Sequence, residues 1–220
     1  MIKDFPDIVI LGNRFIALPQ KAIYWQEENA LLVADVHLGK SATFRVAGVP
    51  IPEGSTDEDL QRLSDALEIS GAKTVYFLGD LTHHRTGKTK EVIGKLQAWF
   101  GQNTDKEFHL MTGNHDRHSG PLDELPWIKV HDELIIQDKF MLRHYPEKQP
   151  GYFVLSGHLH PSVKLKGRGG ERLRLACSVF KKNLAILQAF GSFTGNSTHE
   201  PKPGETIFIA HNNEVFRLGI

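Results

Sequence analysis

The chain has 220 residues, and its 26 lysines and arginines balance its 26 aspartates and glutamates. This length allows one large domain or two small ones, and the composition excludes a collagen-like or a disordered protein. The balanced charge removes the bulk electrostatic argument for nucleic-acid binding, although a local basic surface is still allowed. The 12 histidines are the unusual feature, because several of them lie beside aspartate and glycine.

No apolar run approaches the roughly 20 residues that a helix needs to cross a membrane. The N-terminal residues include an acid and a proline where a secretory signal would have its basic and apolar regions. The single cysteine, Cys177, cannot form an internal disulfide. We therefore expect a soluble, cytoplasmic protein with no membrane partner, in which Cys177 is a small buried residue rather than a nucleophile.

Short apolar runs alternate with amphipathic segments in the first half of the chain. The runs are rich in Val, Ile, Leu and Phe and stop abruptly near glycine or aspartate, as buried strands do. They cover Ala30–Ala34, Thr74–Leu78, Phe108–Met111 and Tyr152–Leu155. Helices are predicted over Thr56–Ser70, which has an acidic first turn, and over Lys90–Phe100. This alternation predicts an α/β fold.

The second half of the chain has apolar runs without a clear helical pattern between most of them. The expected strands are Leu134–Leu142, Ser162–Lys166, Arg172–Cys177, Leu184–Gln188 and Thr206–Ala210. They predict a second, more antiparallel sheet. No repeat, low-complexity segment or long linker divides the chain, so we expect residues 1–220 to form a single domain.

Polar clusters follow the ends of these apolar runs, where open α/β sheets place their ligand sites. The clusters are Asp35-Val36-His37, Gly79-Asp80, Gly113-Asn114-His115-Asp116, Arg143-His144 and Gly157-His158-Leu159-His160. Alternation along the strand is expected to send Asp35 and His37 to the same side. The glycines permit sharp turns and close approach of the backbone. Each cluster alone could be only a turn, a helix cap or a surface histidine, but five in order are hard to explain that way.

Oxygen and imidazole donors without a thiolate favour manganese, iron or zinc. Two such ions about 3.5 to 4 Å apart lower the pKa of a bridging water and stabilise the attacking and leaving oxygens of a phosphate ester. A hydrolytic role is therefore simpler than a redox role.

The five clusters, in this order, resemble the motifs of calcineurin-like metallophosphoesterases. The resemblance implies a four-layer sandwich of two central mixed β-sheets flanked by α-helices. It also implies two divalent metal ions, manganese above all, with iron or zinc as alternatives. Their implied ligands are Asp35, His37 and His160 for the first ion and Asn114, His144 and His158 for the second, with Asp80 bridging the two. His115 is implied as the general acid or as a contact to the phosphate.

The chain also resembles the bacterial ligase-associated DNA damage response endonuclease subfamily, over Leu32–Lys40, Phe44–Gly54 and Ala189–Gly195. That resemblance implies a nuclease in DNA repair, with a DNA ligase or helicase partner and a homodimer. Two alternatives stay open. The neutral charge and short chain suit a phosphodiesterase or phosphatase acting on a small molecule or nucleotide, whereas the full set of ligands counts against a catalytically silent scaffold.

Three features leave the substrate undecided. A basic run could track a phosphate backbone or could mark the solvated face of strands. It comprises Lys164, Lys166, Arg168, Arg172, Arg174, Lys181 and Lys182. One of His83 and His84 is expected to face the site, beside Arg85, but the sequence does not say which. Phe44-Arg45 and Phe190–Phe193 could line the substrate mouth or form small packing clusters.

Overall fold

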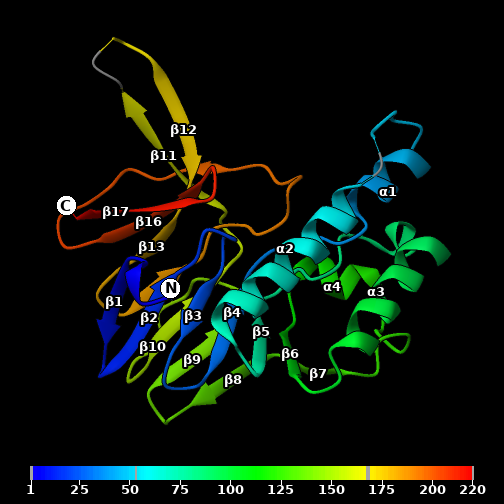
Figure 1. The fold of residues 1–220 in the computed structure, drawn as a ribbon, viewed down its shortest axis with the longest axis horizontal. Helices are drawn as coiled ribbons and strands as arrows, with labels where there is room; N and C mark the ends of the chain where they lie inside the picture. The colour runs from blue at the N-terminus through cyan, green and yellow to red at the C-terminus, as the bar shows by residue number, and fades with distance from the viewer. Residues whose placement is uncertain (1, 53, 167–168, 220) are drawn as a thin grey trace.

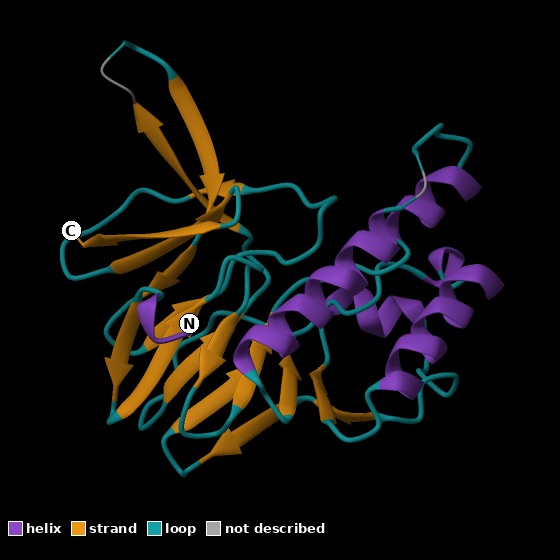
Figure 2. Ribbon diagram, viewed as in Figure 1, coloured by secondary structure: helices purple, strands orange, loops and turns teal. Residues whose placement is uncertain are grey.

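The structure is a computed structural model that describes residues 2–52, 54–166 and 169–219. Glu53, in one of the stretches that carry the subfamily resemblance, and Arg168, in the basic run, lie outside these residues. Two seven-stranded sheets form the centre of the molecule, and a three-stranded sheet is added to them. Figures 1 and 2 show the helices gathered along one side of the strands. The expected α/β fold with two mixed sheets is confirmed.

The first sheet follows the order of the chain from β1 to β7. Its strands are β1 (Asp7–Ile10), β2 (Asn13–Ala17), β3 (Ile23–Trp25), β4 (Ala30–Val33), β5 (Thr74–Phe77), β6 (Glu107–Met111) and β7 (Ile128–His131). The strands from β1 to β4 pair antiparallel, and those from β4 to β7 pair parallel. The carboxyl ends of β4, β5 and β6 therefore meet at one edge of the sheet.

The four α-helices of the described residues all lie between β4 and β7 in the chain. They are α1 (Lys40–Val46), α2 (Ser55–Ser70), α3 (Lys90–Gln102) and α4 (Asn114–Ser119), and two 3₁₀ turns cover Ile2–Asp4 and Arg85–Gly87. Leu63 of α2 and Leu96 of α3 are buried in one cluster with Val33, Phe77 and Leu110 of the first sheet. These helices thus cover the outer face of that sheet. None of the described helices is long and apolar enough to cross a membrane.

The second sheet has the order β17-β16-β13-β14-β10-β9-β8. Its strands are β8 (Glu133–Ile136), β9 (Phe140–Arg143), β10 (Phe153–Ser156), β13 (Ser178–Phe180), β14 (Leu184–Ile186), β16 (Thr206–His211) and β17 (Glu214–Gly219). The prediction of one strand over Leu134–Leu142 was wrong. Gln137 and Asp138 adopt left-handed backbone conformations, with φ of 54° and 52°, and turn the chain into an antiparallel hairpin. Over the described part of this sheet, β10 pairs parallel with β9 and β14, and the other pairs are antiparallel.

The inner faces of the two sheets bury an aromatic core. The Phe15 ring lies 5.1 Å from Trp25, and Trp25 lies 4.7 Å from Phe140 of the second sheet. These three side chains are fully buried, together with Phe180 and Phe208. Burial of large rings on this scale is the dominant stabilising contribution in a domain of this size.

A small sheet packs on the outer face of the second sheet. Its order is β12-β11-β15, with β11 (Pro161–Lys166), β12 (Arg172–Ala176) and β15 (Ser197–Thr198). Val163 of β11 is buried beside Val179 and Ile207, whose side chains point away from the aromatic core. Cys177 lies in this cluster and is fully buried, as expected. Over the described residues, this face is therefore covered by strands, whereas the helices lie on the first sheet.

Candidate metal centre

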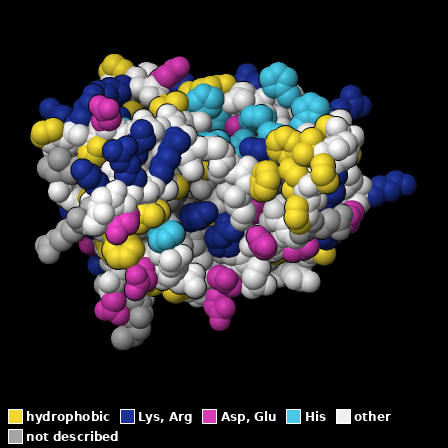
Figure 3. Space-filling view, turned by 90° about the horizontal axis from the view of Figure 1, so that it is seen from above, with side chains coloured by type: hydrophobic (Ala, Val, Ile, Leu, Met, Phe, Trp, Pro, Cys, Tyr) yellow, Lys and Arg dark blue, Asp and Glu magenta, His cyan; other side chains and the backbone are white. Residues whose placement is uncertain are grey.

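The candidate ligands gather at one edge of the sandwich and come from both sheets. Asp35 and His37 follow β4, Asp80 follows β5, and Asn114 begins α4 just after β6. From the second sheet, His144 follows β9, and His158 and His160 follow β10. Figure 3 shows the histidines clustered on this face of the molecule.

Five of the seven candidate ligands have left-handed backbone conformations. The φ angles of Asp35, His37, Asp80, His158 and His160 are 54°, 52°, 51°, 73° and 46°. Such angles are uncommon outside glycine and concentrate at functional sites, where the surrounding structure holds them. Strand alternation does not orient Asp35 and His37, as had been expected, because β4 ends at Val33. The left-handed loop orients them instead.

Hydrogen bonds hold this loop against its neighbours. The amide of Asp35 donates to the Gly79 carbonyl at 3.1 Å, and the amide of His37 donates to the Asp80 carbonyl at 2.9 Å. These two hydrogen bonds join the loop after β4 to the loop after β5 and bring Asp35 and His37 close to Asp80.

The first group of donor atoms belongs to Asp35, His37 and His160, whose ligand atoms lie within 4.8 Å of one another. The Nε2 atoms of His37 and His160 are 3.5 Å apart, and Asp35 Oδ1 is 3.4 Å from His160 Nε2. His160 Nδ1 donates to the Gly195 carbonyl at 3.0 Å. In the neutral ring this leaves the lone pair on Nε2, directed at the group.

The second group belongs to Asp80, His144 and His158, again within 4.8 Å of one another. His144 Nδ1 donates to the Leu78 carbonyl at 3.0 Å, so the lone pair of the neutral ring is on Nε2. That Nε2 atom lies 3.2 Å from Asn114 Oδ1 and 3.5 Å from Asp80 Oδ2. Three acceptor atoms thus face one another, an arrangement that a cation would stabilise.

Asp80 belongs to the second group and also approaches the first. Its Oδ2 atom is 3.9 Å from His37 Nε2 and 3.5 Å from His144 Nε2. Its Oδ1 atom accepts a hydrogen bond from the His115 amide at 2.8 Å. One carboxylate therefore reaches both groups while its other oxygen is held in place.

Three glycines allow the loops to pack this closely. A Cβ atom on Gly113 would lie 2.5 Å from the Asp80 amide nitrogen, and one on Gly157 would lie 2.6 Å from Asp35 Oδ2. A Cβ on Gly79 would overlap the His144 ring, and its φ of 86° also disfavours a side chain. The close backbone approach predicted from these glycines is confirmed.

Burial lowers the pKa of His37 and His158 and so favours the neutral form that binds metals. At His160, by contrast, burial is outweighed by the Asp35 carboxylate, and the pKa is raised. Burial, followed by the charge of Lys40, lowers the pKa of His37 to about 2. Burial raises the pKa of Asp80 to about 6. Asp35 Oδ1 is buried yet accepts no hydrogen bond from the described residues, which is costly unless a cation occupies the space in front of it. These donors fit a pair of divalent metal ions.

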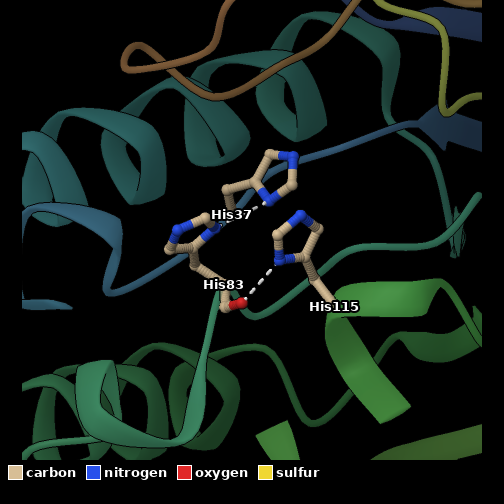
Figure 4. Close-up of side chains that lie close together, drawn as sticks. All are labelled: His37, His83 and His115. Atoms are coloured by element: carbon tan, nitrogen blue, oxygen red, sulfur yellow. Dashed lines mark hydrogen bonds between the residues drawn. The ribbon is translucent and has the colours of Figure 1, made fainter. Parts of the chain in front are cut away.

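His83 packs against His37 and His115, whereas His84 does not contact the candidate ligands among the described residues. As Figure 4 shows, His83 Nδ1 lies 3.4 Å from His37 Nδ1, and His115 Nδ1 donates to the His83 carbonyl at 2.8 Å. The rings of His83 and His115 stack with centroids 4.6 Å apart. His84 is exposed and accepts from the Thr86 amide. The structure thus decides between two adjacent histidines that the sequence could not separate.

The stretch Ala189–Gly195 supports the first group of ligands. The amides of Phe190 and Gly191 donate to the carbonyls of Ala34 and Asp35 at 2.8 and 3.2 Å, and the Gly195 carbonyl accepts from His160. The stretch therefore runs beside one candidate ligand and orients another. This contact explains a motif whose role the sequence did not reveal.

A buried acid on α2 clamps this stretch. Asp59 Oδ1 accepts from the amide and the hydroxyl of Ser192 at 3.1 and 2.9 Å. Arg62 contacts the same carboxylate and donates to the Phe190 carbonyl at 2.6 Å. Sequence reasoning missed both residues, because in the sequence Asp59 is only one of the acids in the predicted first turn of a helix.

Aromatic side chains border the site on the helical side. The Phe44 ring stacks on His83 at 6.4 Å and meets the exposed Phe193 edge-on at 6.1 Å. A cavity of about 440 Å³ lies beside them, lined by Thr43, Val46, Ala47, His83, His84, Thr86 and His115. Of the aromatic residues considered from the sequence, Phe44 and Phe193 thus lie beside His83, whereas Phe190 is fully buried in the core.

Comparisons with known proteins agree with this geometry. The family model for calcineurin-like phosphoesterases matches residues 29–206. The chain belongs to this family. As a calcineurin-like phosphoesterase it is a metal-dependent hydrolase of phosphate esters, and its histidine and aspartate clusters could hold the metal. No curated protein matches the chain.

Solved structures give a close relative. The Pseudomonas putida nuclease MPE shares 34% identity over 98% of this chain and 100% of its own, with a TM-score of 0.83. This likeness agrees with the subfamily resemblance. A protein of unknown function, AQ665 from Aquifex aeolicus, matches at 22% identity over 64% of this chain and 81% of its own, with a TM-score of 0.42. The E. coli phosphoesterase Yfce matches at 11% identity over 87% and 98%, with a TM-score of 0.40.

Proposed function

We propose that this calcineurin-like phosphoesterase is a dinuclear phosphodiesterase that acts as a nuclease on DNA. The observation that carries the dinuclear proposal is the position of Asp80, whose Oδ2 atom is within 4 Å of a histidine nitrogen in each group. A carboxylate in this position can bind two adjacent ions at once. Residues 1–220 would form one domain around this centre, since the core between the sheets joins both halves of the chain.

The ligand roles follow from the two groups. Asp35, His37 and His160 would hold one divalent ion, and Asn114, His144 and His158 the other, with Asp80 between them. When bound, the ions supply Lewis-acid activation of a water molecule and neutralise charge on the phosphate.

His115 would serve as the proton donor. Its Nδ1–H donates to the His83 carbonyl, so Nε2 carries a proton only when the ring is an imidazolium. It is from that form that Nε2 would give a proton to the leaving oxygen. The hydrogen bond from its amide to Asp80 Oδ1 fixes the ring relative to the shared carboxylate. His83 would orient this ring by stacking against it.

A nucleic acid is the proposed substrate because the relative with 34% identity over nearly the whole chain is a nuclease. DNA is proposed because the chain resembles the DNA damage response endonuclease subfamily. A phosphodiesterase or phosphatase acting on a small molecule or nucleotide is the alternative. A role in DNA repair, manganese as the cellular metal, a cytoplasmic location, a ligase or helicase partner and a homodimer stay predictions of the sequence. The presence of every candidate ligand argues against a silent scaffold.

The test is hydrolysis by metal-stripped protein with and without added manganese. A chromogenic phosphodiester and a labelled DNA are assayed in parallel. Manganese-dependent turnover of both supports a nuclease. Turnover of the small diester alone favours the small-molecule alternative, and turnover of neither refutes the proposal.

Two variants separate the roles. Asp80→Ala should lose metal and turnover together, whereas His115→Ala should keep its metal and lose about 10²- to 10⁴-fold in turnover, because it removes only a proton donor. His211→Ala, at an exposed histidine, is the control and should change neither. Equal metal loss in the Asp80 and His115 variants would contradict these assignments.

A further inference from the structure

The strands β11 and β12 form a hairpin that projects from the sandwich, as Figure 1 shows. In their antiparallel register Lys164 pairs with Arg174 and Lys166 pairs with Arg172. Directly opposed residues point to the same face of a sheet, so four cations share one face. The other face carries apolar pairs, among them Val163 with Leu175, and turns toward the second sheet.

This pairing of like charges has an energetic cost. Cations placed directly opposite each other destabilise a strand pair by about 0.2 to 1 kcal/mol. Within the described parts of the chain, none of these four side chains forms an ion pair with a carboxylate, although other surface cations do, such as Lys181 with Glu205 at 3.8 Å. If this face only had to be solvated, it could carry acidic as well as basic side chains and avoid the repulsion. Four cations without an anionic partner in the described chain therefore suggest that the partner is an external anion.

The basic face is continuous with the candidate metal centre. β11 begins at the residue after His160. Arg174 Nε donates to Ser162 Oγ at 2.9 Å, and its guanidinium also contacts the Asn196 carbonyl, next to the Gly195 carbonyl that orients His160. In Figure 3 lysine and arginine side chains gather on one side of the histidines and hydrophobic side chains on the other.

The spacing of the cations along the hairpin suits an extended ligand. Residues two apart on a strand are separated by about 6.6 Å, so Lys164 and Lys166 form a line that leads away from the site. A mononucleotide held at the metals carries its charge at one place and would leave this line unused. A polyanionic chain would meet both the metals and the cations.

We propose that the face formed by Lys164, Lys166, Arg172 and Arg174 binds the phosphate backbone of a polynucleotide whose scissile phosphate lies at the metal centre. This rests on the proposed function and assigns the surface that holds the polymer outside the metal centre. Each phosphate that a cation neutralises releases counterions, so the contact has a measurable dependence on salt.

The test compares the double variant Lys164→Ala/Lys166→Ala with the wild-type holoenzyme. We measure kcat/KM for labelled DNA at several salt concentrations and for a chromogenic diester in parallel. The slope of log kcat/KM for DNA against log salt should become shallower by about 2, one for each phosphate contact removed. The value for the small diester should not change. Arg172→Ala should reduce the slope by about 1.

Two controls guard against a structural effect. Lys139→Ala removes an exposed lysine from the β8–β9 turn, at the other end of β9 from His144, and should leave the slope unchanged. The double variant should unfold at the same temperature as the wild type or higher, since it relieves repulsion across the hairpin.

An unchanged slope in the double variant overturns the inference. Equal losses on DNA and on the small diester also overturn it, because the hairpin would then act through the shape of the site. If the wild type hydrolyses neither substrate, the proposed function fails by itself. The inference is then tested alone by fluorescence anisotropy of labelled DNA in chelator, which measures the DNA affinity of the wild type and of the double variant at several salt concentrations. A salt slope of the affinity that is shallower by about 2 in the double variant supports the inference. An unchanged slope, or no binding by the wild type, overturns it.

Discussion

Gly113→Ala tests whether the spacing between the loops determines the metal centre. The backbone of Gly113, with φ of −89°, is open to alanine, so any effect must come from the added methyl group. That methyl would lie 2.5 Å from the Asp80 amide nitrogen and closer still to the carboxylate. Normal contact needs about 3.5 Å, so one of the two loops must move by roughly 1 Å.

A shift of this size has two expected effects. Overpacking costs about 1 to 3 kcal/mol in the free energy of unfolding. A misplacement of about 1 Å in a positioned group lowers turnover by about 100-fold. We expect both losses, with the loss of turnover present even where the variant is fully folded.

Urea unfolding in chelator gives the first quantity, and manganese-dependent hydrolysis of a chromogenic diester gives the second. Gly94→Ala, in the middle of α3, is the matched control because its Cβ would meet nothing within 4 Å. It should add about 0.5 to 1 kcal/mol of stability and leave turnover unchanged. Wild-type stability and turnover in Gly113→Ala would refute the idea that this contact positions Asp80.

Three further predictions concern residues outside the metal centre. Asp59→Ala releases Ser192 and should raise the manganese concentration for half-maximal turnover about tenfold; an unchanged requirement would count against the clamp. Cys177 is fully buried, and burial raises its pKa to about 12, so a thiol reagent should label it only in denaturant; fast labelling of the native protein would contradict this. Burial raises the pKa of Glu205, but hydrogen bonds from His199 and the Lys202 amide bring it below 4.5 overall. The stability from ionised Glu205 is therefore present above pH 4.5 and lost as the pH falls through the lower folded-state pKa, and the difference between wild type and Glu205→Gln in urea unfolding should shrink in acid.

The strands that are followed by candidate ligands could be predicted from the sequence. β4, β5, β6 and β10 match the predicted runs within one residue at either end, because buried parallel strands are continuous apolar runs. The helices α2 and α3 were found from their apolar spacing. The N-terminal strands β1, β2 and β3 were missed, since runs of three to five residues between turns give little periodicity.

The site was less completely predictable than the strands. The residue types and their order along the chain were enough to predict the candidate ligands. The left-handed loops that orient these side chains have no periodic sequence pattern, so they could not be predicted. The clamp of Asp59 on Ser192 joins residues 133 positions apart, and no local pattern reports such a contact. For the same reason the sequence could not distinguish His83 from His84. The two histidines are adjacent, and only the path of the backbone decides which side chain faces the site.

The aromatic core between the sheets has a consequence for metal affinity. Trp25 lies on β3 beside the strand that leads to Asp35, and Phe140 begins the strand that leads to His144. The separation between the sheets, set by these rings, therefore also sets the gap between the donor atoms that each sheet contributes. A smaller side chain deep in this core would change the spacing of the candidate donor atoms without contacting any of them, and such a mutation would resemble an active-site defect.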